Sequence, residues 1–425
     1  MRNKESKQLK QLSDNFIALL LLQLLNYLLP LLLIPYLIRV LGVEGFGVYS
    51  FILAITLYGV QMSDYGFELS ATYHISLNRD NPKKIDEIFS SVLTIKLIIA
   101  SLYLIFIILL IPLFDKFMLY HQLIILSFGI LLGQVLFPVW FFQGIEKMRY
   151  ILYLNGFLKL IFILSIFLMV KEKSDLHLLL ILNSIITLSV GITALYIAIK
   201  KFKVQLTVQP LSRLYYYLKE GWYLFISKFA VEFYTTINII ILGLFASPLI
   251  VGYYAISVKI IQALGSLLDP ITRTLYPYLI RVYQNSNEDF ISKNRKLSIV
   301  IFLIMMPLSV LVYSSSAFIL ETITGVEAMP LNIHILQIFS FTLIVYLYGS
   351  QFTNMLVTIK KTKFLNQILF LTAGLNTLLA PPLLYFYGVI GMVWLSLFLA
   401  FFLTSIKGYY IFFYHQNKGQ RIIYA

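Results

Sequence analysis

The chain has 425 residues, of which 60% are hydrophobic and 12% are charged; its mean hydropathy is +0.85 and its formal net charge is +14. A soluble protein of this length carries roughly twice that share of charged residues, so the composition excludes a soluble domain. The lack of cysteine excludes disulfides and thiolate chemistry. The five histidines are scattered and show no metal-ligand spacing. We therefore expect an all-α, polytopic membrane protein without a metal or another cofactor.

Apolar segments follow one another along the whole chain, and they predict twelve membrane spans. A helix needs about 20 apolar residues to cross roughly 30 Å of hydrocarbon. We place the spans at about residues 14–38, 46–66, 88–111, 118–142, 149–170, 176–199, 220–245, 250–280, 297–320, 329–358, 364–386 and 389–414. The basic segment 1–10 is typical of a signal peptide, but the apolar run after it is too long and lacks a small-residue cleavage site, which favours a retained helix.

Lysine and arginine are divided unequally between the two sets of loops. One set consists of the segment before the first span, the loops after the even-numbered spans and the segment after the last span. This set carries 23 lysines and arginines. The other loops carry four, which are Arg39, Lys116, Lys171 and Lys173. The positive-inside rule then predicts that both termini are cytoplasmic. Most of the positive charge would face anionic lipid head groups, which excludes nucleic acid as a partner.

The basic loop 200–219 separates six predicted spans from six others, and we predict two lobes, 1–205 and 206–425. A weak internal repeat supports this division. The segment "GVYSFILAITLYGVQMSD" (Gly47–Asp64) aligns with "GYYAISVKIIQALGSLLD" (Gly252–Asp269), which places the second span opposite the eighth. A pseudo-repeat of six and six helices around a central cavity is the usual architecture of alternating-access transporters.

Charged side chains inside the predicted spans are the candidate functional residues. Each costs about 2.5–3.5 kcal/mol at a helix centre unless it faces a cavity or a partner. We interpret Lys407 as a side chain that extends to the membrane surface. The other charged residues inside the predicted spans are Lys96, Lys159, Lys228, Lys259 and Arg273, with Asp64, Glu232 and Asp269. Together they have a net charge of +2. A cationic cavity with apolar walls fits an anionic substrate, such as a phosphate or diphosphate group.

We therefore predict that the five basic residues bind the substrate and that the three acidic residues serve coupling or gating. Lys228 and Glu232 are four residues apart and share a helix face. Lys228 would hold the anion, while Glu232 would balance it in the empty site and could take up a proton. Structural alternatives remain open: the Lys228–Glu232 and Asp269–Arg273 pairs could be structural ion pairs, and Lys96 and Lys159 could hold helices together.

The chain resembles the Wzx-type polysaccharide flippases of the multidrug/oligosaccharidyl-lipid/polysaccharide exporter superfamily. Four segments carry the resemblance: "LLPLLLIPYLIRVLGVEGFGVYSF" (Leu28–Phe51), "DYGFELSAT" (Asp64–Thr72), "FPVWFFQGIEKMRYI" (Phe137–Ile151) and "LKEGWYLFISKFAVEFYTTINIIILG" (Leu218–Gly243). The resemblance implies a transporter, not an enzyme, in the bacterial cytoplasmic membrane. It would move undecaprenyl-diphosphate-linked oligosaccharide units to the outer leaflet for O-antigen or capsule synthesis. A coupling cation, either proton or sodium, and a polysaccharide polymerase and chain-length regulator would be its partners.

Two other functions are compatible with a polytopic protein. A drug or cation antiporter of the same superfamily would need an acidic, aromatic-lined cavity, and the net basic interior argues against one. A membrane polysaccharide polymerase or acyltransferase would need polar catalytic clusters, often on a long external loop. The predicted external loops are short and nearly uncharged, which disfavours an enzyme.

Overall fold

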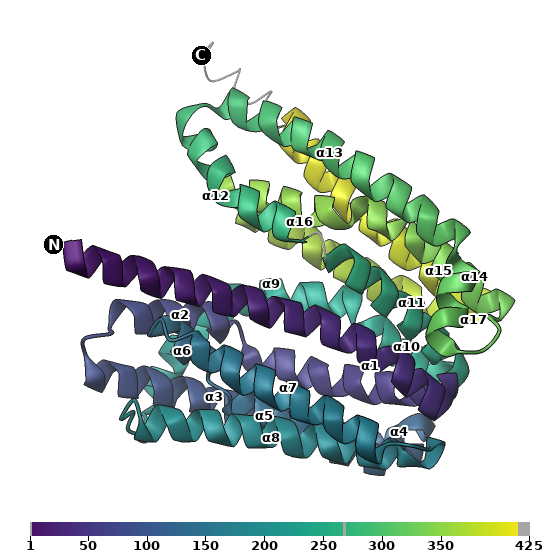
Figure 1. The fold of residues 1–425 in the computed structure, drawn as a ribbon, viewed down its shortest axis with the longest axis horizontal. Helices are drawn as coiled ribbons and strands as arrows, with labels where there is room; N and C mark the ends of the chain where they lie inside the picture. The colour runs from purple at the N-terminus through teal and green to yellow at the C-terminus, as the bar shows by residue number, and fades with distance from the viewer. Residues whose placement is uncertain (1, 267–268, 415–425) are drawn as a thin grey trace. The chain divides into compact units, whose positions relative to one another are not determined.

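The computed structural model describes the backbone of residues 2–266 and 269–414, and the side chains of this part except in 2–32, 158, 227, 230–235, 269–274, 277 and 414. The chain divides into two compact units, Met1–Glu232 and Phe233–Ala425. The described residues form helices and connecting segments without a β-strand (Figure 1). The lobe boundary predicted at 205/206 stays a prediction.

The first unit is a bundle of long helices. Its helices are α1 (Arg2–Asp64), α2 (Phe67–Leu77), α3 (Pro82–Leu110), α4 (Asp115–Leu119), α5 (His121–Leu136), α6 (Val139–Gly144), α7 (Arg149–Met169), α8 (Leu176–Lys200) and α9 (Leu211–Thr235), with short 3-10 turns at Ile111–Leu113 and Lys173–Asp175. The predicted first and second spans are one helix, α1, with a sharp bend at Gly42, whose φ of 74° is readily adopted only by glycine. In Figure 1, α5 and α8 lie side by side.

The second unit is also helical. It contains α10 (Ile237–Phe245), α11 (Pro248–Ser266), α12 (Asp269–Asn285), α13 (Asn287–Ser314), α14 (Ser316–Thr324), α15 (Pro330–Ser340), α16 (Thr342–Thr358), α17 (Thr362–Tyr409) and a π-helical turn, η3 (Tyr410–Tyr414). The predicted eleventh and twelfth spans are both in α17, which bends at Gly388, where φ is 61°. The helices α13 and α16 pack on one another, as do α16 and α17.

Nine helical segments in the part that the structure describes are long and apolar enough to cross a membrane. One of them, Thr362–Phe413, covers both the eleventh and the twelfth predicted spans, joined at the bend at Gly388. Another, Leu33–Leu77, covers the end of the first predicted span and all of the second, joined at the bend at Gly42. The predicted span 220–245 covers parts of α9 and α10 and is not among the nine. The predicted fold class is confirmed: this is an all-α, multi-pass membrane protein.

The core of the first unit surrounds the "FPVWFF" segment. Trp140, Phe141 and Phe142 are at most 2% exposed, and they pack with Phe67 of α2 and Phe89 of α3. Inside a membrane this packing is stabilised mainly by van der Waals contacts, because lipid is as apolar as the protein interior. Helix α6 is therefore buried in the core, where α2 and α3 pack against it.

Helix α9 packs into this same core through its first half. Tyr217 is 2% exposed, and its hydroxyl donates a 3.0 Å hydrogen bond to Oε1 of Glu87 on α3. The segment that leads into α9 is also tied to α3, since the backbone N–H of Gln205 donates to Oδ1 of Asp86 at 2.8 Å. These contacts bring the middle of α9 against the junction between α1 and α2.

Candidate functional site

The junction between α1 and α2 is a tight break that positions two carboxylates. Tyr65 and Gly66 both adopt positive φ, 48° and 75°, so the helix cannot continue past Asp64. For a tyrosine this backbone costs on the order of 1 kcal/mol, which a ring stack on Phe225 of α9 offsets; the two ring centroids are 4.5 Å apart and the rings are 13° from parallel. Asp64 thus ends α1, and Glu68 lies in the first turn of α2.

Glycine at 66 also permits the close approach of α9. A Cβ atom at this position would lie 2.7 Å from Cβ of Leu224, so any larger residue would push α9 away. The lysine four residues after Leu224 is Lys228, one helical turn further along α9. The backbone of the junction therefore sets the distance between α9 and the two carboxylates.

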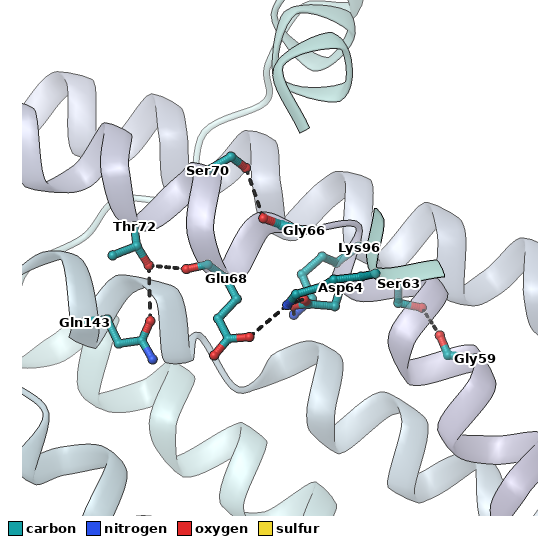
Figure 2. A network of polar contacts seen from close by, with 10 residues as sticks. Gly59, Ser63, Asp64, Gly66, Glu68, Ser70, Thr72, Lys96 and Gln143 are labelled. Atoms are coloured by element: carbon teal, nitrogen blue, oxygen red, sulfur yellow. Dashed lines mark hydrogen bonds and ion pairs between the residues drawn. The ribbon is translucent and has the colours of Figure 1, made fainter. Parts of the chain in front are cut away.

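Lys228 bridges both carboxylates. Its Nζ lies 3.1 Å from Oδ2 of Asp64 and 2.9 Å from Oε2 of Glu68. A second ammonium group, on Lys96 of α3, lies 3.7 Å from Oδ1 of Asp64. Figure 2 shows Lys96 beside Asp64, with Glu68 directed towards them. We call these four residues, Asp64, Glu68, Lys96 and Lys228, the charged cluster; its two carboxylates and two ammonium groups give a formal charge of zero.

The members of the charged cluster differ in their exposure. The side chain of Lys96 is 6% exposed and that of Asp64 is 19% exposed, while Lys228 is 34% and Glu68 46% exposed. Asp64 is thus held between one buried and one accessible ammonium group. A buried ammonium without a counter-ion would cost several kcal/mol, so the Asp64 carboxylate stabilises Lys96 in this position. Glu68 is the member most open to solutes.

A polar cavity of about 210 Å³ adjoins the charged cluster. Asp64, Glu68, Lys96, Gln61 and Gln134 supply its polar lining. Its apolar lining comes from Val60, Val135, Phe137, Val139 and Trp140. At roughly 30 Å³ per water molecule, the cavity holds on the order of seven waters. It can take a hydrated cation or a phosphate group, and it is too small for an oligosaccharide.

Thr72 connects the charged cluster to the aromatic core. Its hydroxyl donates to the backbone carbonyl of Glu68 at 2.5 Å and lies 3.1 Å from the carbonyl of Trp140 and 3.3 Å from Oε1 of Gln143 (Figure 2). At the far end of α2, Nε of Arg79 donates to the carbonyl of Gly144 at 2.7 Å. Helix α2, and with it Glu68, is therefore fixed to α6 at two places.

The structure brings three of the predicted site residues together: Asp64, Lys96 and Lys228. Lys159 lies half-buried on α7 and does not line the cavity, and Lys259 is exposed on α11 in the second unit. Their predicted roles in substrate binding stay predictions. The side chains of Glu232, Asp269 and Arg273 lie outside the described residues, so the predicted Lys228–Glu232 pairing stays a prediction as well. The partners that the structure gives Lys228 are Asp64 and Glu68.

The prediction for Lys407 is wrong. Its side chain does not extend to the membrane surface; the residue is 4% exposed, and Nζ donates a 3.1 Å hydrogen bond to Oγ1 of Thr353 on α16. Close packing of α17 on α16 covers the lysine before it can reach the surface.

Sequence reasoning missed Glu68. It lies just beyond the predicted span 46–66. The signal that could have found it is the spacing in "DYGFELSAT", where Glu68 follows Asp64 by four residues. The predicted span boundary does not anticipate that a second helix, α2, begins directly after Tyr65 and Gly66.

A second polar cluster lies in the second unit and contains no charge. Nδ2 of Asn376 donates to Oδ1 of Asn238 at 2.8 Å, and Nδ2 of Asn238 lies 3.1 Å from Oγ of Ser396 and 3.3 Å from the Tyr254 hydroxyl. Asn238 is 1% exposed and Asn376 is fully buried. We call these four residues the neutral cluster. It joins α10 and α11 to both halves of α17.

A family model identifies the chain. The model, for polysaccharide biosynthesis proteins, matches residues 12–283, which is more than half of the sequence and includes all four segments quoted above. The chain belongs to the polysaccharide biosynthesis protein family. Its resemblance to polysaccharide flippases is thereby confirmed at the level of the family, and the charged cluster lies wholly within the matched region.

Two curated proteins are similar to this family member, and both are named "Putative O-antigen transporter". One, from Escherichia coli (strain K12), is 37% identical over 270 residues, which are 63% of this chain and 64% of that protein, less than two thirds of its length. The other, from Shigella dysenteriae, is 28% identical over 410 residues, covering 93% of this chain and 100% of that protein.

A solved structure shares the fold. It is a multidrug resistance MATE family transporter of the MOP superfamily in an inward-facing conformation. It matches 92% of this chain and 94% of its own chain with a TM-score of 0.61 and 14% sequence identity. At this identity the likeness concerns the fold alone.

Proposed function

We propose that this protein is a flippase that moves undecaprenyl-diphosphate-linked oligosaccharide units from the inner to the outer leaflet of the bacterial cytoplasmic membrane, for O-antigen or capsular polysaccharide synthesis. The family match and the names of the two relatives support a transporter in polysaccharide synthesis. Both termini would lie in the cytoplasm, and a polysaccharide polymerase and chain-length regulator would use the product. The observation that carries the mechanism is the charged cluster beside its polar cavity.

The charge balance of the cluster supports a coupling between a cation and an anionic substrate. With two carboxylates and two ammonium groups the cluster attracts an anion only weakly. Protonation of Asp64 or Glu68, or binding of a sodium ion to them, adds one positive charge and releases part of Lys228 from its ion pairs. The lysine side chains then favour a diphosphate group. By linkage, a bound diphosphate favours uptake of the cation to the same degree.

The size of the cavity supports separate binding sites for the different parts of the substrate. About 210 Å³ accommodates a phosphate-sized group but not several sugar rings. The cluster would therefore recognise the part of the substrate that all polyprenyl-diphosphate oligosaccharides share. The sugar units would be held elsewhere, and the polyprenyl tail would stay in the lipid.

The same features disfavour a drug antiporter. Cationic drugs would need an excess of carboxylates, whereas two lysines balance the two carboxylates of the charged cluster. Drug resistance conferred by overexpression, with no defect in surface polysaccharide on deletion, would support the antiporter instead.

The test is the location of lipid-linked repeat units in a deletion strain. Loss of a flippase should leave single repeat units on the inner leaflet of the cytoplasmic membrane. Delivery of single, unpolymerised units to the cell surface would contradict the proposal and indicate a polymerase. A topology reporter fused after Lys200 or Lys361 should be cytoplasmic, and one after Asp115 or Ala246 external; the reverse would contradict the proposed orientation.

A further inference from the structure

A groove on the second unit contacts neither polar cluster. It has a volume of about 570 Å³, within the range of roughly 300–1,000 Å³ that is usual for small-molecule sites. Its walls come from α13, α16, α17 and η3, and its apolar residues include Ile299, Phe302, Phe401 and Phe413. These four side chains are 56%, 42%, 37% and 59% exposed. The groove therefore presents an apolar channel along the outside of three packed helices.

One end of this groove is basic. Arg295, which lies near the start of α13, lines it together with Ser298. Ser298 donates from Oγ to Oε1 of Gln351 at 3.1 Å, and its carbonyl accepts a 2.6 Å hydrogen bond from Tyr348. The wall at this end is thus held in place by bonds between α13 and α16. Across the described residues, no carboxylate forms an ion pair with Arg295.

Lys407 is not part of this groove. It follows groove-lining Thr404 and Ser405 on α17, but the residue is 4% exposed and its ammonium group donates to Thr353 between α16 and α17. Among the described lining residues, Arg295 is therefore the cation that the groove offers to a ligand.

We propose that this groove binds an anionic phospholipid of the cytoplasmic leaflet, with one acyl chain in the apolar channel and the phosphate at Arg295. The exposed apolar walls favour an acyl chain, and the guanidinium group at one end favours a phosphate. The basic end lies on the side that the positive-inside rule assigns to the cytoplasm, where anionic head groups are enriched.

Native mass spectrometry of the purified full-length protein can test this site with two lipids that share the same acyl chains, phosphatidylglycerol and phosphatidylcholine. We expect the anionic lipid to bind roughly fivefold more tightly, since one basic residue near an anionic head group contributes about fivefold. The variant Arg295→Gln should reduce the preference to less than twofold. The control variant Lys296→Gln removes one exposed charge outside the groove and should keep the preference.

A third variant obstructs the groove without changing its charge. Ser405→Trp places a large side chain in the groove and leaves Arg295 unchanged; it should weaken binding of long-chain phosphatidylglycerol at least fivefold and that of a short-chain analogue much less. Equal binding of the two lipids by the wild type would overturn the proposal. Equal losses in the control variant would do so too, as would displacement of the lipid by inorganic phosphate or by undecaprenyl diphosphate.

Discussion

The charged cluster in the first unit and the neutral cluster in the second differ in what surrounds them. Asp64, Glu68, Lys96 and Lys228 adjoin a polar cavity, and Glu68 is 46% exposed. Asn238 and Asn376 are at most 1% exposed. Buried amides that bond to one another fix helices in one arrangement. Ionisable groups beside a cavity can change their charge when a solute or proton enters. Burial of polar groups is therefore not by itself a sign of transport chemistry; the groups must also be accessible and able to change their charge.

The largest effect is expected from Lys228→Gln, which leaves two carboxylates without their shared partner. Export per molecule of inserted protein should fall at least tenfold. Stability should fall by about 2 kcal/mol, less than the roughly 3–5 kcal/mol of a fully buried pair, because Lys228 is 34% exposed. Surface polysaccharide, normalised to membrane protein, measures the first effect. The control Glu146→Gln breaks the Arg79–Glu146 pair and should leave export unchanged.

A double variant separates folding from transport within the charged cluster. Lys228→Gln/Glu68→Gln removes one charge of each sign, so abundance should recover towards wild type while export stays low. The predicted alternative is tested in parallel with Lys228→Gln/Glu232→Gln. If only the Glu232 combination restores abundance, then Glu232, and not Glu68, is the partner that matters to Lys228 in the membrane.

The neutral cluster should show the opposite pattern. Asn238→Ala removes the acceptor of Asn376 and leaves buried polar groups unpaired, which costs about 1–3 kcal/mol. Thermal stability in detergent should fall by that amount, while export per inserted molecule should change less than twofold. A large loss of export at normal abundance would show that the neutral cluster also takes part in transport and would remove the contrast.

The smallest effect is expected from Lys159→Gln. This residue lies on α7 away from the cavity, so export should fall less than in Lys96→Gln, which leaves Asp64 without its buried partner. Export rates of the two variants, each normalised to inserted protein, give the comparison. Equal losses would favour the single anion site predicted from the sequence, with all the intramembrane lysines contributing.

The fold was largely predictable because hydrophobic composition and span length are strong constraints in a membrane. The bends at Gly42 and Gly388 were not, because a glycine with positive φ can join two spans without a loop between them. The site was predictable only in part. The energetic cost of a charge inside the membrane identifies Asp64, Lys96 and Lys228 as candidate site residues. How these charges pair depends on the helix break at Tyr65 and Gly66, which places Glu68 in the charged cluster. The burial of Lys407 depends on the packing of α17 on α16.

Binding and transport by the variant Asp64→Asn/Glu68→Gln test the central claim most directly. Both changes mimic the protonated carboxylates, so Lys96 and Lys228 remain without counter-charges in the cluster. In reconstituted vesicles at neutral pH, the account predicts severalfold tighter binding of undecaprenyl diphosphate than in wild type, together with loss of its movement between leaflets. Unchanged binding, or movement at the wild-type rate, would contradict the claim that the charged cluster couples a cation to the anionic substrate.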